Sequence, residues 1–287
     1  MSINATFAEF KSDKKPTWCP GCGDFGTMNG ILKALSNTGA RPETTFFVAG
    51  IGCSGKIGTY VRAYSIHGVH GRALPVGCGA KIANPDLEVI VAGGDGDGFS
   101  IGAAHFIHAV RRNVNMTYVV MDNRIYGLTK GQFSPTSGTN LKTKTSPTGT
   151  HMPPLDPLSL AFSSQGTFIA QSFSSDLRRH TEIVEEAIKH DGFGFVNVFS
   201  PCVTYNKVDT YQYFRDNLVD VKDIGHDPTD YDAAKELIFD TETEYQGILY
   251  QNPESISYEK SHNLNSPMWD IPKHPSSKTM DLLRELY

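Results

Sequence analysis

The strongest constraint on the fold is an apolar run that ends in glycines and acids, at residues 87–98. Residues 87–92 are apolar and are followed by glycine, which predicts a short buried strand. Residues 100–112 begin with a serine and carry apolar side chains at helical spacing, so a helix is expected there. A second buried strand is predicted over 115–121. Strand–helix–strand units of this kind build parallel sheets, so we expect an α/β protein with a mainly parallel sheet and helices on both faces.

Polar side chains stand where both of these strands end. Asp95 lies among glycines that let the backbone turn tightly and approach a ligand, and Asn123 follows the second strand. Ligands of such sheets bind at the carboxyl ends of the strands, and carboxylate and amide oxygens suit Mg²⁺. The pair therefore predicts a magnesium–phosphate site, with an ordinary surface turn as the alternative. A Rossmann dinucleotide site is disfavoured, because no G-x-G-x-x-G opens a helix after the first strand.

The composition is that of an ordinary soluble protein, with 39% hydrophobic residues, 20% charged residues and a formal net charge of −5 over 287 residues. No basic excess points to nucleic acid, and no apolar run approaches the roughly 18 residues of a membrane helix. The first residues lack the charged-then-apolar pattern of a secretory signal. We therefore expect a cytoplasmic protein whose cysteines stay reduced and bind metal or take part in catalysis.

A C-x-x-C sequence places Cys19 and Cys22 on one turn, ahead of a helix predicted over 28–35. Thiolates at a helix start are favoured by the amide dipoles. Three interpretations stay open: a redox pair, a zinc site that needs two more ligands, and an iron–sulfur cluster that needs four cysteines. No strand is predicted before the motif, which argues against a thioredoxin-like pair.

The remaining cysteines are Cys53, Cys78 and Cys202. Cys53 follows a predicted strand over 44–49, and Cys202 follows a predicted strand over 195–199. In a parallel sheet both would stand at the same edge, where the C-x-x-C turn could join them. This convergence predicts a four-cysteine site, and leaves Cys78, at the start of a probable short helix, as the spare thiol.

The rest of the chain carries fewer signals. We expect a strand over 168–171, helices over 176–190 and 230–239, and a long Ser-, Thr-, Gly- and Pro-rich loop over 134–157 that is functional or mobile. Residues 1–206 are predicted to form the binding domain, and 207–287 an extended arm for subunit contact, with little core of its own. The exposed apolar side chains expected on this arm are Tyr245, Leu249, Tyr250, Met268 and Trp269.

Together, the ordered motifs resemble the β subunit of the 2-oxoacid:ferredoxin oxidoreductases over about residues 15–210. The G-D-G to Asn123 spacing is similar to the thiamine-diphosphate signature. Cys78 falls where relatives usually have a small residue, so it receives no ligand role. The matching motifs are Trp18-Cys19-Pro20-Gly21-Cys22-Gly23, Gly50-Ile51-Gly52-Cys53-Ser54, His70-Gly71-Arg72-Ala73, Gly94-Asp95-Gly96-Asp97, Tyr126-Gly127-Leu128-Thr129-Lys130-Gly131-Gln132 and Ser200-Pro201-Cys202.

The resemblance implies a set of site residues. Asp95, Asn123 and the Ile125 carbonyl would hold Mg²⁺ on thiamine diphosphate. Lys56 and Lys130 would lie near the substrate and coenzyme A, with a solvated loop charge as the alternative for each, and His70 would lie at the active site. Cys19, Cys22, Cys53 and Cys202 would hold one [4Fe–4S] cluster, and the cofactor would be lined by Gly52, Cys53, Ser54, His70, Gly94, Gly96, Asp97, Gly127, Leu128 and Thr129.

The resemblance also implies an activity: oxidative decarboxylation of a 2-oxo acid with coenzyme A to an acyl-CoA and CO₂, with electrons passing to ferredoxin. The reverse reaction, reductive carboxylation, would fix CO₂. We expect a partner α subunit, in a heterodimer or a dimer of heterodimers, and no nucleic acid or membrane partner. No further C-x-x-C runs are present, which suits the compact two-subunit type and favours 2-oxoglutarate over pyruvate or a broad substrate range. The alternatives are a non-redox thiamine-diphosphate decarboxylase and a non-catalytic, zinc-stabilised interaction subunit.

Overall fold

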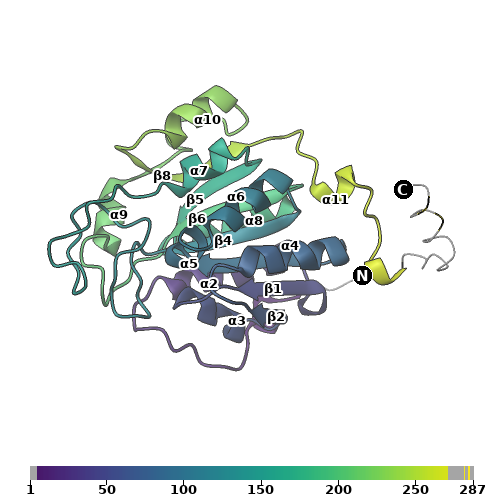
Figure 1. The fold of residues 1–287 in the computed structure, drawn as a ribbon, viewed down its shortest axis with the longest axis horizontal. Coiled ribbons are helices and arrows are strands. Elements are labelled where there is room, and N and C mark those ends of the chain that lie inside the picture. Colours follow the sequence, from purple (N-terminus) through teal and green to yellow (C-terminus); the bar gives the residue numbers. More distant parts are fainter. Residues whose placement is uncertain (1–4, 271–280, 282–283, 285–287) are drawn as a thin grey trace.

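The computed structural model describes residues 5–270 together with Asp281 and Arg284. Its centre is one eight-stranded sheet in the order β2-β1-β3-β4-β6-β5-β8-β7 (Figure 1). The first six strands in this order run parallel, β8 pairs antiparallel with β5, and β7 pairs parallel with β8. The strands are β1 (Thr45–Ala49), β2 (Tyr64–His67), β3 (Glu88–Gly94), β4 (Met116–Asp122), β5 (Phe168–Phe173), β6 (Phe193–Phe199), β7 (Leu218–Asp220) and β8 (Glu244–Gln251).

Helices cover both faces of this sheet (Figure 1). They are α1 (Phe7–Phe10), α2 (Asp24–Asn37), α3 (Ile57–Tyr60), α4 (Ala73–Ala83), α5 (Asp95–Phe99), α6 (Ala103–Arg112), α7 (Pro157–Ser163), α8 (Leu177–Lys189), α9 (Tyr211–Asn217), α10 (Tyr231–Ile238) and α11 (Tyr258–Ser261). Short 3₁₀ turns cover Pro42–Thr44, Ser54–Lys56 and Met268–Asp270.

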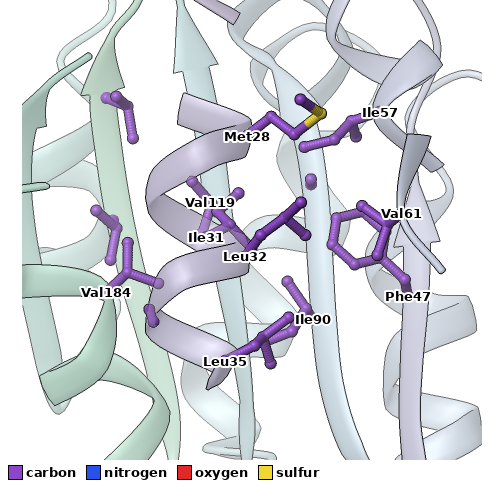
Figure 2. Close-up of a cluster of buried hydrophobic side chains, with 14 of the residues drawn as sticks. Met28, Ile31, Leu32, Leu35, Phe47, Ile57, Val61, Ile90, Val119 and Val184 are labelled. Atoms are coloured by element: carbon purple, nitrogen blue, oxygen red, sulfur yellow. The ribbon is translucent and has the colours of Figure 1, made fainter. Parts of the chain in front are cut away.

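Successive residues of a strand point to opposite faces, so the apolar runs supply two cores. Along β3, Ile90 and Ala92 belong to the core under α2 and α8, whereas Val89 and Val91 belong to the core under α4, α6 and α7. Figure 2 shows Leu32 and other α2 side chains packing toward the sheet. Strands buried on both faces read as continuous apolar runs, which is why the sequence indicates them clearly.

The predicted elements are confirmed with shifted ends. The strands and helices expected in residues 28–199 are all present, and α10 is present in the following segment. The helix expected over 100–112 begins at Ala103, and a separate helix, α5, covers Asp95–Phe99. The expectation that Cys78 stands at a helix start is wrong, because it lies buried in the middle of α4. Residues 134–156 contain no helix or strand, as expected.

The segment after residue 207 is more integrated than expected. β8 pairs with β5 in the main sheet, and Leu249 is fully buried against the core under α7. The expectation of an exposed Leu249 on an extended arm is therefore wrong, and Tyr245 and Tyr250 are partly buried against the same core. Met268 and Trp269 are exposed, as predicted. Within the described part of the chain, no helix has the length and apolarity that crossing a bilayer requires.

Candidate functional site

The parallel strands bring their carboxyl ends to one edge of the sheet. The loop after β1 carries Cys53, the end of β3 meets Asp95, the end of β4 meets Asn123, and the loop after β6 carries Cys202. These strands are neighbours in the order β1-β3-β4-β6, so all four residues stand at the same edge of the sheet. This is the position where sheets of this class bind ligands.

A cavity of about 430 Å³ opens at this edge. Among the described residues, Lys56 and Lys130 are not part of its lining, and the Lys56 Nζ instead lies 3.4 Å from the Thr17 hydroxyl. Every residue predicted to bind the cofactor contributes to this lining, and sequence reasoning missed Ile51, Tyr126 and Gln132. The lining residues are Ile51, Gly52, Cys53, Ser54, His70, Gly94, Asp95, Gly96, Asp97, Asn123, Ile125, Tyr126, Gly127, Leu128, Thr129 and Gln132.

Asp97 ties two of the cavity loops together. Its Oδ1 accepts hydrogen bonds from the backbone N–H of Ile51 at 3.0 Å and of Gly71 at 2.8 Å, and lies 2.8 Å from Nδ1 of His70. A Cβ on Gly50 would lie only 2.2 Å from the Asp97 Oδ2, so this loop needs glycine at that position. The buried carboxylate thereby fixes the loop after β1 against the loop that carries His70.

Two buried carboxylates meet beneath the cavity. The Thr136 hydroxyl lies 2.9 Å from Oδ2 of Asp95 and 2.9 Å from Oδ1 of Asp122. Burial, together with the Asp122 carboxylate, raises the pKa of Asp95 to about 7. The Asn123 Oδ1 accepts from the Ile125 N–H at 3.0 Å, which holds the amide at the same strand end. A cation bound here would offset the repulsion between the carboxylates.

The four predicted cysteines lie near one another. A Cβ on Gly127 would be 3.6 Å from the Cys53 Sγ and 3.7 Å from the Cys202 Sγ, so these two thiols flank the same residue. Burial raises the pKa of Cys22 well above its ordinary value, with Asp24, Cys202 and Cys53 adding to the shift. Burial and Asp24 likewise raise the pKa of Cys53 to about 11. A metal that accepts thiolates would offset this cost of ionisation.

Hydrogen bonds join the three segments that carry these cysteines. The Trp18 indole donates to the Cys53 carbonyl at 2.6 Å. The Ser200 hydroxyl donates to Oδ1 of the fully buried Asp24 at 2.8 Å, and the Gly23 N–H donates to the Pro201 carbonyl at 3.2 Å. In residues 5–270, no three His, Cys, Asp or Glu side chains are drawn together as tightly as a metal ligand set. The segments are held in place, and the thiols remain free.

The sequence did not single out Asp24, Asp122 or Thr136. Asp24 directly follows the C-x-x-C-G motif, and Asp122 directly precedes Asn123, so a buried acid beside each predicted ligand was a usable signal. Thr136 had no such signal, because it reaches the site from a loop that the sequence pattern only marks as irregular. Its role depends on how that loop returns to the sheet edge.

Comparison with known proteins identifies the family. Residues 50–198 match the thiamine pyrophosphate enzyme C-terminal TPP binding domain, and residues 202–265 match the C-terminal region of the pyruvate ferredoxin oxidoreductase beta subunit. The 2-oxoacid:ferredoxin oxidoreductase subunit beta of Saccharolobus solfataricus is 39% identical in an alignment of 291 positions, which covers 93% of this chain and 95% of that protein. The chain belongs to the family of 2-oxoacid:ferredoxin oxidoreductase β subunits.

Further relatives of this β-subunit family cover most of the chain. The 2-oxoglutarate synthase subunit KorB of Archaeoglobus fulgidus is 35% identical, over 83% of this chain and 92% of its own length. The solved 2-oxoglutarate:ferredoxin oxidoreductase from Magnetococcus marinus, with 2-oxoglutarate, coenzyme A and succinyl-CoA bound, superposes with a TM-score of 0.90 at 40% identity. That match covers 97% of this chain and 96% of the other. The resemblance predicted from the motifs is thereby confirmed, as is the fold class.

Proposed function

We propose that this chain is the β subunit of a 2-oxoglutarate:ferredoxin oxidoreductase. The observation that carries this proposal is the adjacency of the two halves of the site. Gly127 lines the cavity that holds Asp95 and Asn123, and also lies between the thiols of Cys53 and Cys202. Thiamine diphosphate bound in the cavity would keep the two electrons that decarboxylation of a 2-oxo acid leaves behind. It would therefore stand beside an iron–sulfur cluster, which passes electrons on one at a time. The choice of 2-oxoglutarate over pyruvate follows the KorB and Magnetococcus relatives.

Thiamine diphosphate and Mg²⁺ fit the cavity residues. The Asp95 carboxylate, the Asn123 amide oxygen and the Ile125 carbonyl are oxygen donors of the kind that Mg²⁺ uses together with substrate phosphates. When bound, the cofactor would supply the electron sink for loss of CO₂. Glycine is needed at position 96, because a Cβ there would lie 2.2 Å from the ring of Tyr126, which lines the cavity.

One [4Fe–4S] cluster fits the four cysteines. The thiols of Cys53 and Cys202 flank Gly127, and the segment that carries Cys19 and Cys22 is hydrogen-bonded to both of their loops, through Trp18 to the Cys53 carbonyl and through Gly23 to the Pro201 carbonyl. Four thiolates are the ligand set of such a cluster. Cys78 is buried in α4 on the opposite face and takes no part. The cluster would pass electrons one at a time to ferredoxin.

The remaining groups of the active site are assigned to the substrates and the partner. His70 faces the cavity beside Asp97. Lys56 and Lys130 stand outside the cavity lining and are proposed to meet the 2-oxo acid and coenzyme A. The α subunit would complete the site, in a heterodimer or a dimer of heterodimers, and the reaction would run in either direction.

The test is an anaerobic visible spectrum, with iron, sulfide and thiamine analysis, on the chain copurified with its natural partner. We expect iron–sulfur absorbance that bleaches when 2-oxoglutarate and coenzyme A are both added. Bleaching with pyruvate and coenzyme A, but not with 2-oxoglutarate and coenzyme A, would change the assigned substrate to pyruvate. A colourless protein with bound thiamine diphosphate would favour a non-redox decarboxylase, and one with zinc and no thiamine diphosphate would favour an interaction subunit.

A further inference from the structure

Four basic side chains lie on the segments that precede or contact the C-x-x-C turn. We call Lys14, Lys15, Lys207 and Arg215 the basic rim. Residues 11–21 and 203–217, which supply it, contain five basic and three acidic residues, although the whole chain has a net charge of −5. One of those acids, Asp209, is buried and paired with Arg124. The rim is therefore a positive region on a negatively charged protein.

Lys207 is linked to the C-x-x-C turn by Val203. Its Nζ donates to the Val203 carbonyl, next to Cys202, while its side chain is exposed. A Cβ at Gly21 would lie 3.7 Å from Cγ1 of Val203, so Val203 packs directly on the C-x-x-C turn. Val203 thus links the charged end of Lys207 to both the segment after Cys202 and the C-x-x-C turn.

Arg215 reaches the same turn from α9. The Tyr211 hydroxyl donates to the Gly21 carbonyl at 3.0 Å, and the Arg215 guanidinium carbon lies 5.8 Å from the centre of the Tyr211 ring. Arg215 also donates to the Ser175 hydroxyl at 3.0 Å, and it forms no ion pair with the acidic residues in the described part of the chain. Its charge is positioned, exposed and available to a partner.

Lys14 and Lys15 lie in the segment that leads into the C-x-x-C turn. They precede Cys19 by only a few residues, and the Lys14 side chain is 66% exposed with one loose contact of 3.9 Å to Asp13. Cys19 itself is exposed, whereas Cys22, Cys53 and Cys202 are partly buried. The cysteine site is therefore open to solvent at Cys19, on the turn that Val203 and Tyr211 contact. Exposed Val208 and Tyr205 add apolar contact area beside it.

We propose that the basic rim is the docking surface for an acidic iron–sulfur electron-carrier protein, an inference that rests on the proposed function. Complementary charge accelerates association and fixes orientation more than it adds affinity. Each docking event would pass one electron from the reduced cluster of this subunit to the oxidised cluster of the carrier. Two carrier molecules would thus be reduced for each 2-oxo acid oxidised.

The test uses the copurified holoenzyme with 2-oxoglutarate and coenzyme A. Two acceptors are compared at low ionic strength, an acidic ferredoxin and the small dye methyl viologen. The double variant Lys207→Glu/Arg215→Glu reverses two rim charges. The matched control is Lys189→Glu, because Lys189 lies in the last turn of α8, beside His190, whose ring contacts the Thr167 hydroxyl at the opposite edge of the sheet.

We expect the double variant to lose about tenfold or more in kcat/KM for ferredoxin, in line with the usual size of electrostatic steering. Its viologen rate and cluster absorbance should match those of the parent, and its ferredoxin rate should depend less steeply on salt. Lys189→Glu should behave as the parent does. An unchanged ferredoxin kcat/KM, or an equal loss with both acceptors, would overturn the docking assignment. A parent enzyme that fails to reduce viologen would instead overturn the proposed function.

Discussion

The Thr136 hydroxyl lies 2.9 Å from Oδ2 of Asp95. This contact joins the long loop after β4 to the end of the neighbouring strand β3. The same hydroxyl also contacts Asp122, and the Ser137 hydroxyl donates to the Arg124 carbonyl at 2.6 Å. The start of the loop is thus fixed at the carboxylate pair, and its end is tied back to the start by the Leu155 N–H, which donates to the Pro135 carbonyl at 2.8 Å.

Removing the Thr136 hydroxyl should weaken Mg²⁺-dependent binding of thiamine diphosphate. We expect Thr136→Val to lose about tenfold in affinity, since partners that orient metal ligands commonly contribute 10–100-fold. Thr136→Ser keeps the hydroxyl and should retain binding, whereas Asp95→Ala should abolish it. Titration of the apoprotein with the cofactor at fixed Mg²⁺ measures all three. Equal affinities for the Val and Ser variants would show that the hydroxyl does not position Asp95.

Cys53 and Cys78 offer a direct test of the ligand set. Cys53→Ser should abolish the visible absorbance and lower the iron content, because three thiolates no longer complete the set. Cys78→Ala should leave both unchanged, because Cys78 packs in the core under α4, away from Gly127. Loss of the cluster in Cys78→Ala, with retention in Cys53→Ser, would mean that the wrong four cysteines are assigned.

The hydrogen bond between Ser200 and Asp24 should matter for stability. Asp24 is fully buried, burial raises its pKa to about 6, and its Oδ2 has no hydrogen-bond partner within the described structure. Ser200→Ala would remove the donor to the other oxygen, at a cost of about 1–3 kcal/mol in the free energy of unfolding. Anaerobic urea denaturation checks this value against the exposed-site control Ser261→Ala. A shift no larger than that of the control would contradict the prediction.

His180 should make stability depend on pH. It is fully buried between α8, β5 and α2, with Nδ1 2.9 Å from the Ser172 hydroxyl and Nε2 3.2 Å from the Thr27 carbonyl. Burial lowers its pKa to about 4, against an ordinary value near 6.5. Between these values the unfolded chain binds the extra proton, so the contribution of His180 to stability is complete above about pH 6.5 and is lost as the pH falls towards 4.

The corresponding experiment is denaturation at pH 7 and pH 5. The pH dependence of the free energy of unfolding should be smaller in His180→Gln than in the parent by about 2 kcal/mol over this interval. His190, whose pKa burial also lowers to about 4, adds a contribution of the same sign in both proteins. The difference between the two slopes therefore isolates His180, and identical slopes would exclude it as the titrating group.

The parallel strands were predictable because they are buried on both faces. Nearly continuous apolar runs form β1, β3, β4, β5 and β6. A short run of that kind is typical of a strand that helices cover on both faces. β8 was missed because its sequence, Glu-Tyr-Gln-Gly-Ile-Leu-Tyr-Gln, is neither a continuous apolar run nor a strict alternation, and it carries a glycine in its middle. The helix at Asp95–Phe99 was missed because its residues, Asp-Gly-Asp-Gly-Phe, have low helix propensity, and the tertiary setting overrides that preference.

The candidate site was predictable where residues follow strands directly. The parallel topology places the residues that follow each strand at one edge of the sheet, so the order of the chain alone predicts where Asp95, Asn123, Cys53 and Cys202 lie. Contacts between side chains of separate loops were not predictable in this way. Thr136 on the two carboxylates and Trp18 on the Cys53 carbonyl each depend on how an irregular segment folds back over many residues.

The position of β6 has a consequence for the order in which the protein is built. β6 lies between β4 and β5, both of which precede it in the chain, and Cys202 follows it. A nascent polypeptide emerging from the ribosome therefore carries three of the four thiols for about half of its synthesis before the last arrives. Until then a gap remains in the middle of the sheet. We therefore expect metal delivery to the proposed four-cysteine site to be a late event, which waits for the central strand to be inserted.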